Sequence, residues 1–211
     1  MNVISLITDF GLEDNFVGVM KAVILRINPA AKIIDICHEV KPQDTLEAAF
    51  LLKGSFKYFP RGTVHLVVVD PGVGSRRKKI LVKAKDYFFI GPDNGVLSLA
   101  LKDQLPLEIV NITNEQYFLK PLSDTFHGRD IFAPTAAYLS KEQDYSKFGK
   151  RIKSIQELRL HPTKINANIL TGEIIYIDRF GNLISNIDKD QLHKFIKNKK
   201  FKICIKDKII N

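Results

Sequence analysis

A carboxylate and two arginines flank a glycine-containing loop in the first half of the chain. The apolar run over residues 64–69 ends at Asp70, which is followed by two glycines and two arginines, Gly72, Gly74, Arg76 and Arg77. An apolar, β-branched run that stops at turn residues predicts a buried parallel strand that opens into a loop. Ligands of open α/β sheets bind beyond the carboxyl ends of the strands, so Asp70 is predicted to lie near a ligand-binding site. The alternative is an aspartate that only caps a turn.

Similar turns follow other predicted strands. Acidic residues and glycine occur together at residues 8–11, 91–95 and 178–182. A polar loop over residues 121–130 carries His127 and Arg129 directly before a predicted helix, where free backbone N–H groups favour anions or oxygens. Each feature alone has a structural explanation, since a single histidine is more often structural than catalytic.

The elements that must position these residues alternate between strand and helix. Apolar residues recur at helical spacing over residues 16–27, and Asp44 caps a second helix in a capping box with Glu47 reaching back. Residues 80–84 and 87–90 form a predicted hairpin, and residues 107–112 a further strand. This alternation predicts an α/β fold with a mostly parallel central sheet covered on both sides.

A charged stretch without periodicity, residues 141–163, contains the predicted domain boundary. We expect an N-terminal α/β domain over residues 1–160 and a partial C-terminal β domain over residues 165–211. The second domain is predicted from alternating runs at residues 167–177 and 183–187.

Composition narrows the class of protein. A chain of 211 residues, 45% hydrophobic and 26% charged, is typical of a soluble globular protein that needs no disulfide or metal for stability. Its two cysteines, Cys37 and Cys204, lie in apolar runs and are predicted to be buried in a reducing compartment. We find no signal peptide and no membrane-spanning run, which favours the cytoplasm.

The net charge of +9 does not by itself indicate nucleic acid binding. Residues 188–211 hold eight lysines and three aspartates, and so contribute 8 − 3 = +5 of it. These lysines alternate with Ile and Phe as on solvated surfaces, and no helix-turn-helix or aromatic-plus-basic signature accompanies them. Nucleic acid binding through this lysine-rich tail remains the weaker alternative.

Five motifs taken in order carry a resemblance to a known family. They are Thr8-Asp9-Phe10-Gly11, Val69-Asp70-Pro71-Gly72-Val73-Gly74, Gly91-Pro92-Asp93-Asn94-Gly95, residues 125–134 around His127, and Ile177-Asp178-Arg179-Phe180-Gly181-Asn182-Leu183. From Met1 to about Ile187 the sequence resembles the S-adenosyl-L-methionine (SAM) hydroxide adenosyltransferase family, the SAM hydrolases, which are relatives of SAM-dependent fluorinase and chlorinase.

The resemblance implies a Rossmann-like N-terminal domain and a small C-terminal β domain. It also implies a homotrimer, with each active site between the N-terminal domain of one subunit and the C-terminal domain of its neighbour. The implied reaction is attack of water on the ribose C5′ of SAM, which gives adenosine and L-methionine. SAM is then the substrate, and no cofactor or metal is expected.

The resemblance further assigns roles to individual residues. Asp70, Arg77 and His127 match the water-activating set, with Arg76 as the alternative to Arg77. An aspartate beside an arginine is a poor proton acceptor, so we expect Asp70 to orient the water and a neutral His127 to be the final base. Asp9 is expected to hold the ribose hydroxyls. The remaining expected ligand contacts are Asp14 and Asp178 to the methionine ammonium, Phe180 stacked on adenine, and Asn182 at the adenine edge.

The sequence departs from the family at its C-terminal end. Family members usually continue beyond this point, and a later segment supplies further contacts to adenine and to the methionine carboxylate. We therefore expect a truncated C-terminal domain, with open strand edges and one wall of the pocket missing. The alternative function is a non-catalytic SAM- or adenosine-binding remnant, which would bind these ligands without turnover.

Overall fold

A seven-stranded sheet organises the first of the two units into which the chain divides, Met1–Leu158 and Arg159–Asn211. The computed structural model describes residues 2–102, 104–197, 199–206 and 208–210. The strands lie in the order β2 (Lys32–Cys37), β1 (Val3–Thr8), β3 (Val64–Val68), β5 (Phe88–Pro92), β4 (Lys79–Lys83), β6 (Glu108–Ile112) and β7 (Gly149–Ile152).

The first four strands in this order run parallel, whereas β4 is antiparallel to both β5 and β6, and β7 is antiparallel to β6. Strand β6 therefore shares the direction of the parallel four, which makes five of the seven strands in this sheet codirectional. The predicted α/β fold with a mostly parallel sheet is confirmed.

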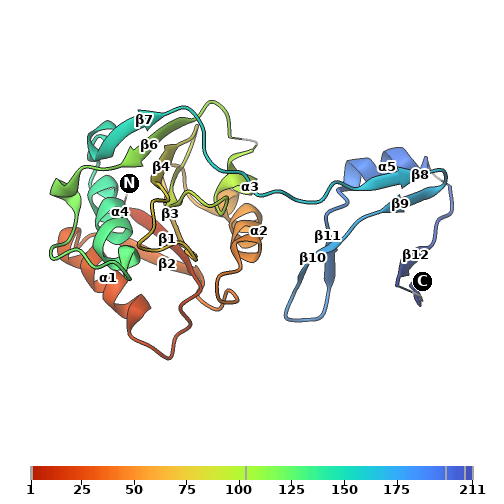
Figure 1. Cartoon of the computed structure of the whole chain (residues 1–211), viewed down its shortest axis with the longest axis horizontal. Helices are drawn as coiled ribbons and strands as arrows, with labels where there is room; N and C mark the ends of the chain where they lie inside the picture. The colour runs from red at the N-terminus through yellow and green to blue at the C-terminus, as the bar shows by residue number, and fades with distance from the viewer. Residues whose placement is uncertain (1, 103, 198, 207, 211) are drawn as a thin grey trace. The chain divides into compact units, whose positions relative to one another are not determined.

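Helices cover both faces of this sheet (Figure 1). Helices α1 (Phe16–Ile27) and α4 (Ala133–Ser140) pack on one face, and α2 (Thr45–Ser55) and α3 (Ser98–Leu101) pack on the other. The side-chain period of a strand explains the two cores. In β3, Leu66 and Val68 join the core beneath α1 and α4, whereas Val67 joins the core beneath α2. Short helical turns complete the unit: η1 (Phe56–Tyr58), η2 (Glu115–Tyr117), η3 (Gly128–Phe132) and η4 (Tyr145–Phe148).

One local prediction in this unit is wrong in part. Asp44 does cap α2, since its Oδ1 accepts from the Glu47 backbone N–H at 2.9 Å. Glu47 reaches past Asp44, however, and accepts from the Lys41 N–H, because the Asp44 N–H already donates to the Lys41 carbonyl. The stretch 141–163, whose sequence lacks strong periodicity, contains η4 and the edge strand β7. Because this edge strand has only four residues, two of them exposed and none fully buried, it leaves little periodicity in the sequence.

The second unit consists of hairpins and one helix. Strand β8 (Lys164–Asn166) pairs with β9 (Ile169–Thr171), β10 (Ile174–Ile177) with β11 (Leu183–Ser185), and β12 (Ile203–Ile205) with β13 (Lys208–Ile210), while α5 spans Lys189–Ile196. None of the described residues of this unit is fully buried. Cys204, in this unit, is exposed, and Cys37, at the end of β2 in the first unit, is half-buried. The prediction that both cysteines are buried is therefore wrong. No helix among the described residues is long and apolar enough to cross a membrane.

Candidate functional site

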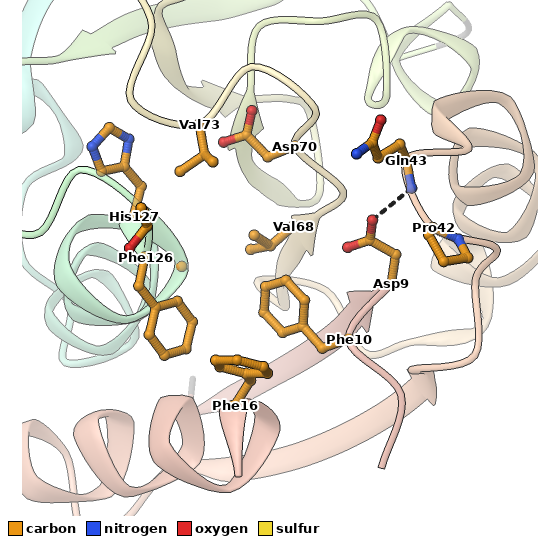
Figure 2. A pocket seen from close by; sticks show the side chains of 12 residues that line it. Asp9, Phe10, Phe16, Pro42, Gln43, Val68, Asp70, Val73, Phe126 and His127 are labelled. Atoms are coloured by element: carbon orange, nitrogen blue, oxygen red, sulfur yellow. Dashed lines mark hydrogen bonds between the residues drawn. The ribbon is translucent and has the colours of Figure 1, made fainter. Parts of the chain in front are cut away.

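A cavity of about 330 Å³ opens in the first unit, where the loops after β1 and β3 meet the loop before α4. This volume lies within the usual range of small-molecule sites. Figure 2 shows carboxylates and an imidazole around its upper part and three phenyl rings below. The lining residues are Asp9, Phe10, Phe16, Pro42, Gln43, Val68, Asp70, Val73, Thr125, Phe126, His127 and Gly128.

Asp70, Arg77 and His127 converge at this cavity although they are far apart in the sequence. Arg77 holds Asp70 with two hydrogen bonds, from Nε to Oδ1 at 2.7 Å and from Nη2 to Oδ2. The same Nη2 lies 3.0 Å from Nδ1 of His127. Only 9% of the Arg77 side chain and 6% of the Asp70 side chain are exposed, so the pair is well shielded from water. Arg76 is exposed, and it is Arg77 that joins the two cavity-lining residues.

The loop that carries Arg77 back to Asp70 depends on one glycine. Gly74 has a φ of +75°, and a Cβ at this position would lie 2.6 Å from the Asp124 carbonyl oxygen. No side chain fits there without moving the backbone, so glycine lets this loop approach the segment that leads to His127.

The contact with Arg77 fixes the protonation of His127. A guanidinium has only donors, so Nδ1 of His127 must accept from Nη2, which leaves the ring proton on Nε2. Burial lowers the pKa of His127, and the positive charges of Arg77 and Lys79 lower it further. His127 is therefore a neutral imidazole that offers an N–H to a ligand.

A π-helical turn and a buried aspartate hold the loop around His127. His127 directly precedes η3, in which the Ala133 N–H donates to the Gly128 carbonyl. Asp130 is fully buried and accepts from the Ser123 N–H at 2.8 Å and from Nε of Arg129 at 2.6 Å. These bonds fix the approach of the loop from both sides of His127.

A second carboxylate, Asp9, lines the cavity next to Asp70 (Figure 2). Its Oδ2 accepts from the Gln43 backbone N–H at 2.8 Å. Burial raises the pKa of Asp9, against the lowering effect of this bond, and the charge of Asp70 adds to the rise. A partly buried carboxylate with remaining acceptor capacity suits the recognition of neighbouring hydroxyl groups.

Three phenylalanines form the apolar wall of the cavity. The ring centroids of Phe10, Phe16 and Phe126 lie 5.2 to 5.9 Å apart in tilted and edge-to-face pairs. Our sequence reasoning did not assign these rings or Gln43 to the site. An apolar residue inside an otherwise polar turn motif was the available signal for Phe10 and Phe126, whereas Phe16 is the first residue of α1.

The other predicted site residues are not among those that line this cavity. Asp14 is on the exposed turn before α1 and is not among the residues that line the cavity. Asp178, Phe180 and Asn182 lie together in the turn between β10 and β11 of the second unit. There Asp178 accepts from the Phe180 N–H and from the backbone and side-chain N–H groups of Asn182, and the Asn182 side chain is the main cause of its lowered pKa. Phe180 is 91% exposed.

The described residues contain no group of three or more His, Cys, Asp or Glu side chains arranged to hold a metal ion. The cavity instead combines hydrogen-bonding groups with an aromatic wall. Such an arrangement can bind a polar organic molecule and place a water molecule against it.

Comparisons with known proteins agree with this geometry. The chain is 40% identical to the (R)-S-adenosyl-L-methionine hydrolase of Methanocaldococcus jannaschii, in an alignment that covers 91% of this chain and 69% of that protein. A fluorinase of Nocardia brasiliensis is more distant, at 26% identity over 91% of this chain and 73% of that protein. A crystal structure of an uncharacterized conserved protein from Thermotoga maritima superposes with a TM-score of 0.90 at 41% identity, and covers 98% of this chain and 80% of that one.

Two family models match consecutive parts of the chain. The SAM hydroxide adenosyltransferase N-terminal domain matches residues 4–149, and the C-terminal domain of the same family matches residues 172–211. The first match alone spans more than half of the chain and includes the cavity-lining carboxylates and His127. The chain therefore belongs to the SAM hydroxide adenosyltransferase family.

Proposed function

We propose that this protein hydrolyses SAM to adenosine and L-methionine by attack of water at the ribose C5′. The observation that carries the proposal is the convergence of Asp70, Arg77 and His127 on one cavity that also presents Asp9. The water oxygen forms a bond to C5′ while the C5′–S bond breaks, and its electron pair goes to sulfur. The positively charged sulfonium thereby becomes the neutral thioether of methionine, and one proton is released.

In this proposal Asp70 and His127 share the handling of the water. Arg77 holds both Asp70 oxygens in place, so the carboxylate presents its remaining lone pairs in a fixed direction. A water oxygen that has bonded to carbon is strongly acidic, so even an arginine-paired carboxylate accepts its proton. Because Nδ1 of His127 is engaged by Arg77, we assign His127 the role of donor through Nε2 and not that of the base expected from the sequence.

The other side of the cavity is proposed to hold the substrate. Asp9 accepts hydrogen bonds from the ribose 2′ and 3′ hydroxyls, since one carboxylate can accept both. With the water at Asp70 and the ribose at Asp9, the leaving sulfur faces the wall formed by Phe10, Phe16 and Phe126 (Figure 2). The negative faces of phenyl rings favour a sulfonium cation.

We also propose that the working assembly is a homotrimer. Unit 2 exposes large apolar side chains, and exposed apolar surface of this kind marks association sites. They include Phe180, Ile165, Ile169 and Ile177. In the proposed trimer, Asp14 and Asp178 contact the methionine ammonium. Phe180 stacks on adenine, and Asn182 forms a hydrogen bond with the adenine edge. The residues of the second unit, Asp178, Phe180 and Asn182, come from a neighbouring subunit. Light scattering of the full chain tests the assembly, and a monomer at working concentration contradicts it.

The proposed reaction needs no cofactor or metal ion, because the sulfonium is already a good leaving group. Dialysis against a chelator should leave the rate unchanged. The two unpaired cysteines suit the reducing conditions of the cytoplasm, which is the proposed location.

Incubation of the purified chain with SAM in ¹⁸O-labelled water tests the function. We expect adenosine and methionine in equal amounts, with the label in the 5′-hydroxyl of adenosine and none in methionine. Asp70→Asn should abolish turnover while adenosine still binds. Calorimetric binding of SAM without product formation by the wild-type chain would instead support the non-catalytic binding protein.

A further inference from the structure

A second set of polar side chains lies behind Asp9 and takes no part in the cavity. Thr8 Oγ1 is 2.8 Å from Nδ1 of His38, and Nε2 of His38 is 3.0 Å from Oδ1 of Asp35. The other oxygen of Asp35 accepts from Nζ of Lys21 at 2.5 Å. The set thus runs from a buried hydroxyl through an imidazole and a carboxylate to a lysine near the surface.

The order hydroxyl, imidazole, carboxylate is that of a hydrolase triad, but the burial excludes that role. Thr8 is 0% and His38 4% exposed, so no substrate can reach the hydroxyl. The negative charge of Asp35 lies 3.0 Å from Nε2 without the alignment of a hydrogen bond, and it favours the tautomer with the proton on Nε2. Nδ1 is then the acceptor of the Thr8 hydroxyl. The hydroxyl oxygen in turn accepts from the Phe10 N–H at 3.4 Å.

These contacts fasten the turn that carries two cavity-lining residues. Asp9 stands between Thr8 and Phe10, and the Gly11 N–H donates to the His38 carbonyl at 2.8 Å. The turn is therefore held by the His38 side chain on one side of Asp9 and by its backbone on the other.

The sheet register shows how His38 reaches this position. Strands β1 and β2 pair regularly up to Leu6 and Asp35, and then Ile7 pairs with Cys37, so that Ile36 is an extra residue on β2. Irregularities of this kind redirect side chains beside functional sites.

We propose that His38, acting through Thr8, is a positioning residue that fixes the Asp9 carboxylate for recognition of the ribose hydroxyls. This inference rests on the proposed function, which assigns those hydroxyls to Asp9. Its consequence is a selective loss of hydroxyl recognition when the Thr8–His38 contact is broken, while the rest of the cavity is retained.

The test compares calorimetric affinities of the full chain for adenosine and for 2′,3′-dideoxyadenosine. Thr8→Val keeps the side-chain shape and removes the hydroxyl. It should lower the preference for adenosine about tenfold, as expected for loss of one hydrogen bond to a charged group. His38→Leu should cause a similar loss, and the double variant little more, because the two residues act as one unit. Thr8→Ser should restore the preference.

The same strand supplies a matched control. Ser5 Oγ lies 2.7 Å from Nδ1 of His65, in a buried hydroxyl–imidazole pair that does not line the cavity. Ser5→Ala should lower the melting temperature as Thr8→Val does, but should leave the preference for adenosine unchanged. An unchanged preference in Thr8→Val, or an equal loss in Ser5→Ala, overturns the inference.

Amide hydrogen exchange of Phe10 and Gly11, measured without ligand, separates this inference from the proposed function. Faster exchange in Thr8→Val supports the positioning role of His38 and Thr8 even if the wild-type protein neither hydrolyses SAM nor prefers adenosine. That wild-type result would reject only the function. If the wild type hydrolyses SAM and prefers adenosine, and Thr8→Val shows the same amide exchange and the same preference, the proposed function stands and the positioning role fails.

Discussion

Lowering the pH from 7.5 to 5.0 should destabilise the first unit by about 2 kcal/mol through His65 alone. His65 lies in β3, is fully buried, and is surrounded by the rings of Phe56, Phe59, Tyr87 and Phe89. Its Nδ1 contacts Ser5, and its Nε2 has no hydrogen-bond partner among the described protein atoms. Burial lowers the pKa of His65 from 6.5 to about 3.

The sign and size follow from these two pKa values. The unfolded chain binds a proton at His65 below pH 6.5, whereas the folded chain does so only near pH 3. The contribution of neutral His65 to stability is therefore complete above pH 6.5, and falls steadily as the pH drops toward 3. At pH 5.0, about 1.5 units below the pKa of 6.5 in the unfolded chain, protonation of His65 stabilises the unfolded state by about 2 kcal/mol.

Urea unfolding followed by tyrosine fluorescence measures this effect. The chain has no tryptophan, and five of its six tyrosines precede residue 159, so the signal reports mainly on the first unit. The control is the double variant Ser5→Ala/His65→Leu, which removes the titrating ring and leaves no unpaired hydroxyl. The wild type should lose about 2 kcal/mol more than the control between the two pH values. Equal losses in the two proteins would refute the reasoning.

Three further predictions concern the site. Arg77→Lys should lower the rate constant of the chemical step about 100-fold or more in single-turnover assays, because lysine cannot hold both Asp70 oxygens. The Kd for adenosine should change less than about threefold. The kcat/KM for SAM should decrease as the pH is lowered below 6.5, because burial lowers the pKa of His127 and only its neutral form accepts from Arg77. The pH profile of His127→Gln should lack this decrease. Phe16→Leu should weaken SAM binding about 2- to 30-fold by calorimetry, with little change for neutral S-adenosylhomocysteine.

Each of these predictions has a contradicting outcome. Arg76→Lys is the matched control for Arg77, and equal losses in both would show that pairing with Asp70 is not what matters. A His127→Gln profile with the wild-type acidic limb would assign that limb to another group. Equal weakening of SAM and S-adenosylhomocysteine by Phe16→Leu would make the ring a steric and not an electrostatic contact.

Much of the fold was predictable because the buried strands are long apolar runs that end at turn residues. The runs before Asp9 and Asp70 place both carboxylates at the same sheet edge, and parallel pairing of β1 with β3 brings them together. Strand β7 was not predictable, since it has only four residues and none of them is fully buried, which is too little to show an alternating pattern. The reach of Glu47 to Lys41 depends on a turn that only the folded backbone defines.

The candidate site was only partly accessible from the sequence. The family resemblance pointed to Asp70 and His127 and favoured Arg77 over Arg76, but which arginine pairs with Asp70 depends on the direction in which each side chain leaves the loop. The tautomer of His127 depends on a contact across 50 residues of sequence, and no local pattern encodes it. Thr8 and His38 look like ordinary strand-end residues until the extra residue in β2 brings them together.

The π-helical turn after His127 has a consequence for how this loop tolerates length changes. A π turn contains one residue more than an α-helical turn needs, so deleting one residue within Gly128–Phe132 would leave a regular α-helix. The π turn absorbs this residue within a single turn, so its removal would leave both α4 and the segment before it in their present phase around the helix axis. The imidazole of His127 would therefore still face Arg77, so a chain shortened by one residue at this turn should remain folded and keep the contact between the two side chains.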